Sequence, residues 1–123
     1  HFYDVYTCSD GRHISLGALE PQFYALLVEK LGWTDIDPAK QYDKSTWPAL
    51  KARLQTQIAT QPQSHWCQVF EGTDVCFAPV LTLSEAAQHP HNRARGLFIE
   101  DSLAGIQTQA APRFLPLSGE PGA

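Results

Sequence analysis

A strand pattern gives way to a helix pattern within the stretch Gly17-Ala18-Leu19-Glu20-Pro21-Gln22-Phe23-Tyr24. Before this stretch, Ile14 and Leu16 alternate with polar residues, which is the period-two pattern of a half-buried strand. Pro21 suits the first turn of a helix, because an N–H at that position would have no helical partner. One helical face then carries large apolar residues, namely Phe23, Leu26, Leu27 and Leu31. The sequence therefore predicts a strand that passes directly into a helix.

Short strand and helix signals alternate over the rest of the chain. A β-hairpin is expected from residues 2–7 and 12–18, because Gly11 can adopt the positive φ of a tight turn. Further helices are expected from about residues 45, 64 and 82, the last with a capping box formed by Thr82 and Glu85. Further strands are expected at 75–80, 97–100 and 107–110. These signals predict an α+β fold, with a small antiparallel sheet formed from both ends of the chain and about four intervening helices.

The composition excludes several classes of protein. The chain has 123 residues, of which 43% are hydrophobic and 18% charged, as is typical of one globular domain. A net charge of -4 and the lack of a long basic stretch argue against nucleic-acid binding. No run of about 18 apolar residues is present, so we expect no membrane span. The three cysteines match no disulfide framework, which favours the reducing cytoplasm.

The sequence begins at His1 and contains no methionine. The simplest interpretation is a piece of a longer polypeptide, although proteolysis or a trimmed tag would look the same. The chain also lacks the Gly-x-Ser-x-Gly, Walker and Gly-x-Gly-x-x-Gly motifs. We therefore expect no complete catalytic set within these residues.

Two polar clusters have simple structural interpretations. His65 and Cys67 lie two residues apart on an expected helix, whereas metal ligands on a helix usually lie three or four apart. Arg93 and Arg95 could bind a phosphate, but cations also offset the exposed carbonyls after a helix end. We favour the structural role for both clusters.

Glu20 is unusual for its position, since Ser, Thr, Asp or Asn is the common residue before the first turn of a helix. A carboxylate gains there from the positive end of the helix dipole. The same geometry would display the carboxylate at a rigid junction, where functional groups are often held. The capping position and the helix dipole, taken alone, favour a structural role for Glu20.

Five blocks of the sequence resemble the α-methylacyl-CoA racemases of the family III CoA-transferase group, also called the CaiB/BaiF family. The blocks occur in the family's order and cover nearly the whole chain. They are Tyr3-Asp4-Val5-Tyr6-Thr7-Cys8-Ser9-Asp10-Gly11, the stretch around Glu20, Asp74-Val75-Cys76-Phe77-Ala78-Pro79-Val80-Leu81, His89-Pro90-His91-Asn92-Arg93-Ala94-Arg95-Gly96 and Ala111-Pro112-Arg113-Phe114.

The resemblance implies a two-domain enzyme that forms an interlocked homodimer. Residues 1–115 would be its small, C-terminal domain and residues 116–123 a flexible tail. The large CoA-binding domain, which carries the His/Asp acid–base pair of the racemases, is absent from this sequence. The resemblance makes Glu20 an auxiliary site residue in a reaction on an acyl-CoA substrate, with no metal or redox cofactor. It also implies that the chain alone is inactive.

Two other interpretations of the chain's function are compatible with the sequence. The chain could be the small domain of a CoA-transferase of the same family, since the deciding aspartate nucleophile would lie in the large domain. The motif around Glu20 favours a racemase. Alternatively, the chain could be a free-standing binding module, whose apolar surface would contact a partner or a second copy.

Overall fold

The computed structural model describes residues 1–103 and 105–109. The chain divides into two compact units, His1–Val80 and a second unit that begins at Leu81. The elements of the first unit are β1 (Tyr3–Thr7), β2 (His13–Gly17), α1 (Pro21–Lys30), the 3₁₀ turn η1 (Pro38–Lys40), α2 (Trp47–Ile58), α3 (Gln63–Phe70) and β3 (Phe77–Val80). Those of the second unit are α4 (Leu83–Gln88), α5 (Pro90–Ala94), β4 (Phe98–Asp101) and β5 (Gly105–Thr108).

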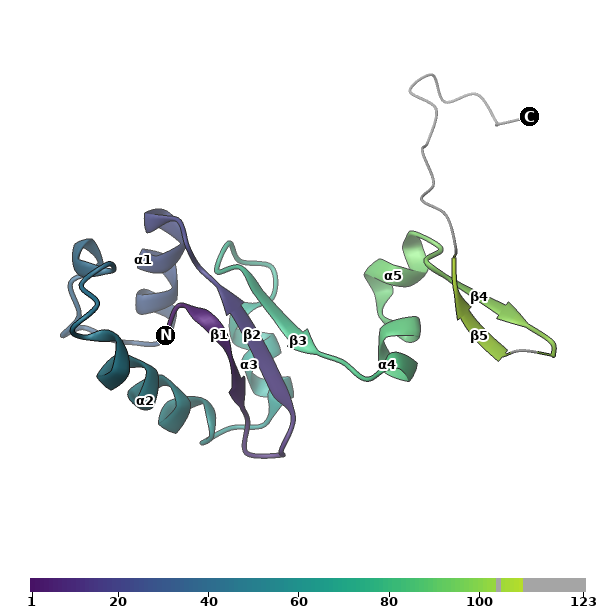
Figure 1. The fold of residues 1–123 in the computed structure, drawn as a ribbon, viewed down its shortest axis with the longest axis horizontal. Coiled ribbons are helices and arrows are strands. Elements are labelled where there is room, and N and C mark those ends of the chain that lie inside the picture. Colours follow the sequence, from purple (N-terminus) through teal and green to yellow (C-terminus); the bar gives the residue numbers. More distant parts are fainter. Residues whose placement is uncertain (104, 110–123) are drawn as a thin grey trace, which may run out of the picture. The chain divides into compact units, whose positions relative to one another are not determined.

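The first unit is built on an antiparallel sheet with the order β1-β2-β3 (Figure 1). Gly11 has a φ of 76° in the turn between β1 and β2, as the hairpin prediction requires. In the register of the sheet, Val5 lies opposite Ser15, and Ser15 lies opposite Ala78. Pro79 is on the edge strand β3, where the N–H that proline lacks is not needed by a second neighbour.

One face of this sheet forms the hydrophobic core with the helices. Tyr6, Ile14 and Leu16 are buried on that face, as the period-two pattern predicts. The helices contribute further buried residues to the same cluster, among them Tyr24, Leu27, Leu54, Ile58, Trp66 and Phe70. Burial of these side chains supplies the main stabilisation of the unit.

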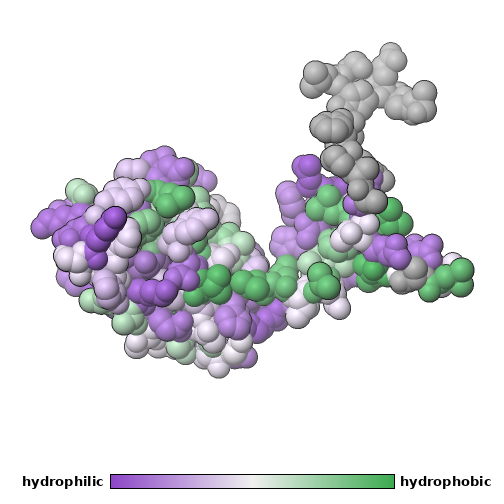
Figure 2. Space-filling view, viewed as in Figure 1, coloured by the Kyte–Doolittle hydropathy of each residue, from purple (hydrophilic) through white to green (hydrophobic). Residues whose placement is uncertain are grey.

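The opposite face of the sheet is exposed, and we call it the open sheet face. It comprises Tyr3, Val5, Thr7, His13, Ser15, Gly17, Ala78 and Val80, which alternate with the core residues. Tyr3 is 67% exposed and Val5 50%, although both are large hydrophobic residues. Figure 2 shows hydrophobic residues gathered where β3 ends, while much of the visible surface of the first unit is hydrophilic or near neutral.

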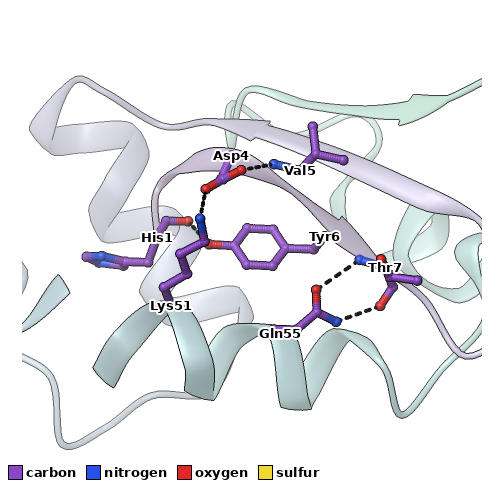
Figure 3. A network of polar contacts seen from close by, with 7 residues as sticks. All are labelled: His1, Asp4, Val5, Tyr6, Thr7, Lys51 and Gln55. Atoms are coloured by element: carbon purple, nitrogen blue, oxygen red, sulfur yellow. Dashed lines mark hydrogen bonds and ion pairs between the residues drawn. The ribbon is translucent and has the colours of Figure 1, made fainter. Parts of the chain in front are cut away.

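Side chains of α2 close the free edge of β1 (Figure 3). The amide of Gln55 accepts a hydrogen bond from the Thr7 N–H at 3.1 Å and donates one to the Thr7 carbonyl at 2.9 Å. Lys51 forms an ion pair with Asp4, which in turn accepts a hydrogen bond from the Val5 N–H. These contacts occupy backbone groups that an exposed strand edge would otherwise offer to another strand.

The ion pair of Asp4 and Lys51 predicts a small pH-dependent contribution to stability. The hydrogen bond from Lys51 lowers the pKa of Asp4 below its ordinary value. A lowered pKa stabilises the folded state above the unfolded pKa of about 4, and this stabilisation disappears as the pH falls through the folded pKa. Because both side chains are substantially exposed, Asp4→Asn should cost less than about 1 kcal/mol at pH 7.

Urea unfolding of the wild-type and Asp4→Asn chains at pH 7 and pH 3 checks this expectation. The difference between the two chains should be largest at pH 7 and smaller at pH 3, where the Asp4 carboxyl is partly protonated. An equal difference at both pH values would show that the charge of Asp4 does not contribute.

The α+β class predicted from the sequence is confirmed, but the expected single sheet from both ends of the chain is wrong. Among the described residues, β4 and β5 pair with each other in a separate sheet, with Phe98 opposite Thr108, and β3 is the strand that joins the first hairpin. Strands that are close in sequence pair at a lower cost in loop-closure entropy than strands from distant ends.

The number of helices also differs from the prediction of about four, since the described residues contain five α-helices and η1. The additional α-helix is α5, and Pro90 is its first residue. Proline was expected to end the preceding helix there, but it is also well accommodated at the first position of a new helix. The capping box of α4 is confirmed, with Thr82 and Glu85 each bonded to the other's backbone N–H.

Candidate functional site

Glu20 lies at the junction between β2 and α1. Its backbone is extended, with φ -73° and ψ 143°, and its carbonyl accepts hydrogen bonds from the N–H groups of Phe23 and Tyr24. The side chain makes no capping hydrogen bond to the helix and is exposed. Among the residues that the structure describes, none forms a hydrogen bond or an ion pair with this carboxylate. The carboxylate is therefore displayed at the surface and is not used by the described part of the chain.

The backbone that leads to Glu20 is held by hydrogen bonds from three distant segments. The Gly17 N–H donates to the Cys76 carbonyl at 2.9 Å, and the Ala18 N–H donates to the Phe2 carbonyl at 2.9 Å. The Leu19 carbonyl accepts a hydrogen bond from the Tyr42 hydroxyl at 2.6 Å. A fixed backbone with a free carboxylate is the arrangement expected of a positioned functional group.

Gln41 is the central support of this junction. It is 2% exposed, and its side-chain N–H₂ donates to the carbonyls of Ala18 and Leu19 at 3.0 Å each. The backbone carbonyl of Gln41 accepts a hydrogen bond from the indole N–H of Trp47 at 2.8 Å. The sequence did not predict this role, because Gln41 and Tyr42 lie in a segment with no periodic pattern. Such a segment predicts a loop.

Cys76 lies beside the same junction. It is exposed and has a φ of 55°, a left-handed conformation that is uncommon for residues other than glycine. Burial raises the pKa of the Cys76 thiol, and the negative charges of Glu20 and Asp74 raise that pKa further. The carboxylate of Glu20 is thus within electrostatic reach of the thiol.

The Cys76 thiol provides a direct reporter of where the Glu20 carboxylate points. Glu20→Gln removes one of the charges that oppose the thiolate, so alkylation of Cys76 by iodoacetamide at pH 8 should become about twofold faster. Peptide mass spectrometry resolves this cysteine from the other two. Glu29→Gln, an exposed position on α1, is the matched control and should leave the rate unchanged. An unchanged rate in Glu20→Gln would show that the carboxylate points elsewhere.

A shallow hollow of about 520 Å³ lies on the open sheet face beside this junction, and we call it the sheet hollow. Its lining includes Tyr3, Val5, Ser15, Gly17, Cys76 and Ala78. A second pocket, of about 630 Å³, is lined by Leu19 and by aromatic residues that include Phe2, Tyr42 and Trp47. Tyr3 contributes to both. Leu19, Gly17 and Cys76, which lie near Glu20, thus line two largely apolar spaces.

The other residues considered from the sequence lie on two different helices. His65 and Cys67 lie on α3, while Arg93 and Arg95 lie at the end of α5 in the second unit. Within the part of the chain that the structure describes, no three His, Cys, Asp or Glu residues are grouped as a metal site requires. Residues 1–103 and 105–109 contain no helix long and apolar enough to cross a membrane. The block 111–114 and the predicted tail 116–123 lie outside the described residues.

A model of CoA-transferase family III matches residues 1–122, and the chain belongs to this family. It is 41% identical to mouse alpha-methylacyl-CoA racemase over 116 residues, which are 94% of this chain and 29% of the mouse protein. It is 39% identical to the human alpha-methylacyl-CoA racemase over 114 residues, or 93% of this chain and 30% of the human protein. The chain thus spans less than a third of the length of these relatives.

A solved structure also has a similar fold. The chain superposes on a mutant form of Rv3272 from Mycobacterium tuberculosis with a TM-score of 0.71. The matched region covers 92% of this chain and 33% of that one, at 16% sequence identity. At this identity the likeness supports the fold alone.

Proposed function

We propose that this chain is the small domain of an α-methylacyl-CoA racemase-like enzyme and that it contributes Glu20 to a shared active site. The observation that carries the proposal is the exposed Glu20 carboxylate, which has no bonding partner among the described residues although its backbone is held firmly. The similarity to the mouse and human racemases over more than nine-tenths of this chain supports the same assignment.

The proposed reaction is a 1,1-proton transfer at the carbon next to the thioester carbonyl of an acyl-CoA. One base removes the α-proton to give an enolate, and an acid returns a proton to the opposite face. Negative charge that develops on the thioester oxygen requires nearby hydrogen-bond donors. In this proposal the two principal proton-transfer groups belong to a large CoA-binding domain, and Glu20 is auxiliary to them.

The role proposed for Glu20 follows from its charge and its surroundings. A carboxylate without a partner among the described residues is available to accept hydrogen bonds from groups of another domain. It would orient those groups or raise the pKa of a neighbouring acid. The proposed partner is the large domain of the second subunit in an interlocked homodimer, and the proposed substrate is an acyl-CoA. No metal or redox cofactor is included, and the cytoplasm is the proposed location.

Proton exchange in deuterated water tests the proposal. The 123-residue chain is incubated with a 2-methylacyl-CoA, in parallel with the family-length protein, which is the chain extended by its large domain. Deuterium should appear at the α-carbon with the family-length protein and stay at buffer background with the 123-residue chain. Exchange well above background with the short chain would contradict the assignment of the principal acid and base to another domain.

A CoA-transferase small domain is the second candidate, and the family to which the chain belongs supports it. The two reactions differ in the large domain, where a transferase carries a nucleophilic aspartate and a racemase a His/Asp pair. The coding sequence upstream of His1 therefore discriminates between them. A start codon directly before His1 would instead favour a free-standing binding module.

A further inference from the structure

We propose that the sheet hollow binds part of the acyl group of the substrate and that the missing side chain of Gly17 sets the size of the group that fits. This inference rests on the proposed function and deepens it, because it assigns a substrate-binding surface beside Glu20. It starts from a glycine that the fold does not require.

Gly17 ends the strand β2 and lies opposite Tyr3 in the sheet. Its φ is outside the positive range that only glycine adopts readily, so its backbone conformation does not require glycine. A Cβ atom built on Gly17 would lie 3.7 Å from the Cys76 carbonyl oxygen and 3.8 Å from the Tyr3 ring, which are ordinary contact distances. Neither the backbone conformation nor close packing against residues 1–103 and 105–109 therefore explains the glycine.

Gly17 is the last residue of β2 but is still paired with Tyr3 in the sheet. A glycine within a sheet often marks a place where a ligand or another backbone approaches closely. The space over Gly17 belongs to the sheet hollow, whose volume of about 520 Å³ is within the range of small-molecule sites. The absent side chain leaves room on the open sheet face between the Tyr3 ring and Cys76. We infer that a ligand group occupies this room.

The chemistry of the hollow favours an acyl group over the nucleotide part of CoA. The phosphates of CoA require cations or a group of N–H donors. No Lys, Arg or His is among the residues that line the hollow in the described part of the chain, and the charged residue there, Asp4, is paired with Lys51. Tyr3, Val5, Phe77 and Ala78 instead offer a largely apolar surface.

The position of the hollow matches the chemistry proposed for Glu20. Cys76 lines the hollow and senses the charge of Glu20. The Gly17 N–H donates to the Cys76 carbonyl, so these two residues are held together at the end of the hollow near Glu20. An acyl group in the hollow would place its α-carbon near this carboxylate.

Substitutions at Gly17 in the family-length enzyme test the inference. Initial rates of α-proton exchange are measured with 2-methylbutanoyl-CoA and with the longer 2-methyldecanoyl-CoA. Gly17→Val should reduce the ratio of kcat/KM for the longer to the shorter substrate by about tenfold or more, and Gly17→Ala by a smaller factor. Thr7→Val, at the far end of β1 on the same sheet face, is the control and should leave the ratio unchanged.

Three results would overturn the inference. The first is an unchanged ratio in both Gly17 variants, which would show that the acyl group does not contact this surface. The second is an equal loss with both substrates. The third is dissociation of the Gly17→Val enzyme on size-exclusion chromatography, which would show that the open sheet face contacts protein. If Gly17→Val does not fold, Gly17→Ala carries the test alone.

Failure of this inference is distinguishable from failure of the proposed function. A wild-type enzyme that exchanges α-protons, and that is slowed by Glu20→Gln, upholds the proposed function whatever the Gly17 variants do. A wild-type enzyme that exchanges no α-protons of any 2-methylacyl-CoA contradicts the proposed function and this subsite with it.

Discussion

Glu20→Gln is expected to slow α-proton exchange by the family-length enzyme about ten- to a hundredfold in kcat. The substitution keeps the size of the side chain and removes its charge. A positioned acid or base contributes a factor of about 100 to 10,000 in rate, and an auxiliary carboxylate that acts on such a group should contribute less. Because no described residue bonds to the Glu20 carboxylate, the effect should fall on catalysis and not on folding.

The control for this substitution is Glu29→Gln, which makes the same change at an exposed position of α1. Urea denaturation should give both variants a free energy of unfolding within about 0.5 kcal/mol of the wild-type value, as is usual for exposed positions. Deuterium incorporation into a 2-methylacyl-CoA measures the rates, and Glu29→Gln should match the wild type. Unchanged turnover in Glu20→Gln would remove Glu20 from the site.

Gln41→Ala is expected to lower the free energy of unfolding of the 123-residue chain by about 2–3 kcal/mol. The substitution removes the two hydrogen bonds to the carbonyls of Ala18 and Leu19 and leaves a space where a buried side chain was. An unsatisfied buried acceptor costs about 1–3 kcal/mol. The Leu19 carbonyl keeps its hydrogen bond from the Tyr42 hydroxyl in this variant. The larger part of the lost stability is therefore expected from the Ala18 carbonyl, which loses its bond from Gln41.

Urea denaturation followed by tryptophan fluorescence measures this loss, and Gln22→Ala at an exposed position of α1 is the matched control. Gln22→Ala should change the stability by less than about 0.5 kcal/mol. In the family-length enzyme, Gln41→Ala should also lower kcat, because the backbone before Glu20 loses its support. Wild-type stability in Gln41→Ala would contradict the role assigned to this glutamine.

The sequence predicted the elements that depend on local signals. The hairpin follows from alternation and from the positive φ of Gly11, and the start of α1 follows from Pro21. The capping box of α4 is contained in four consecutive residues. The position of Glu20 between strand and helix could be predicted for the same reason, since both neighbouring elements have clear patterns.

Features that depend on distant contacts could not be predicted in this way. Gln41 bonds to carbonyls 22 and 23 residues earlier in the chain, and nothing in its neighbouring sequence indicates burial. The pairing of β3 with β2 joins segments that are far apart in sequence, and period-two patterns do not specify a partner strand. The left-handed conformation of Cys76 likewise has no local signal, because the residue is not glycine, asparagine or aspartate.

A crystal structure of the family-length enzyme with a bound, unreactive acyl-CoA analogue tests the central proposal most directly. We expect the Glu20 carboxylate to lie within hydrogen-bond reach, about 3 Å directly or through one water, of the acid–base pair or of the thioester. A Glu20 side chain that faces bulk solvent, with the acyl group bound at another surface, would contradict the account.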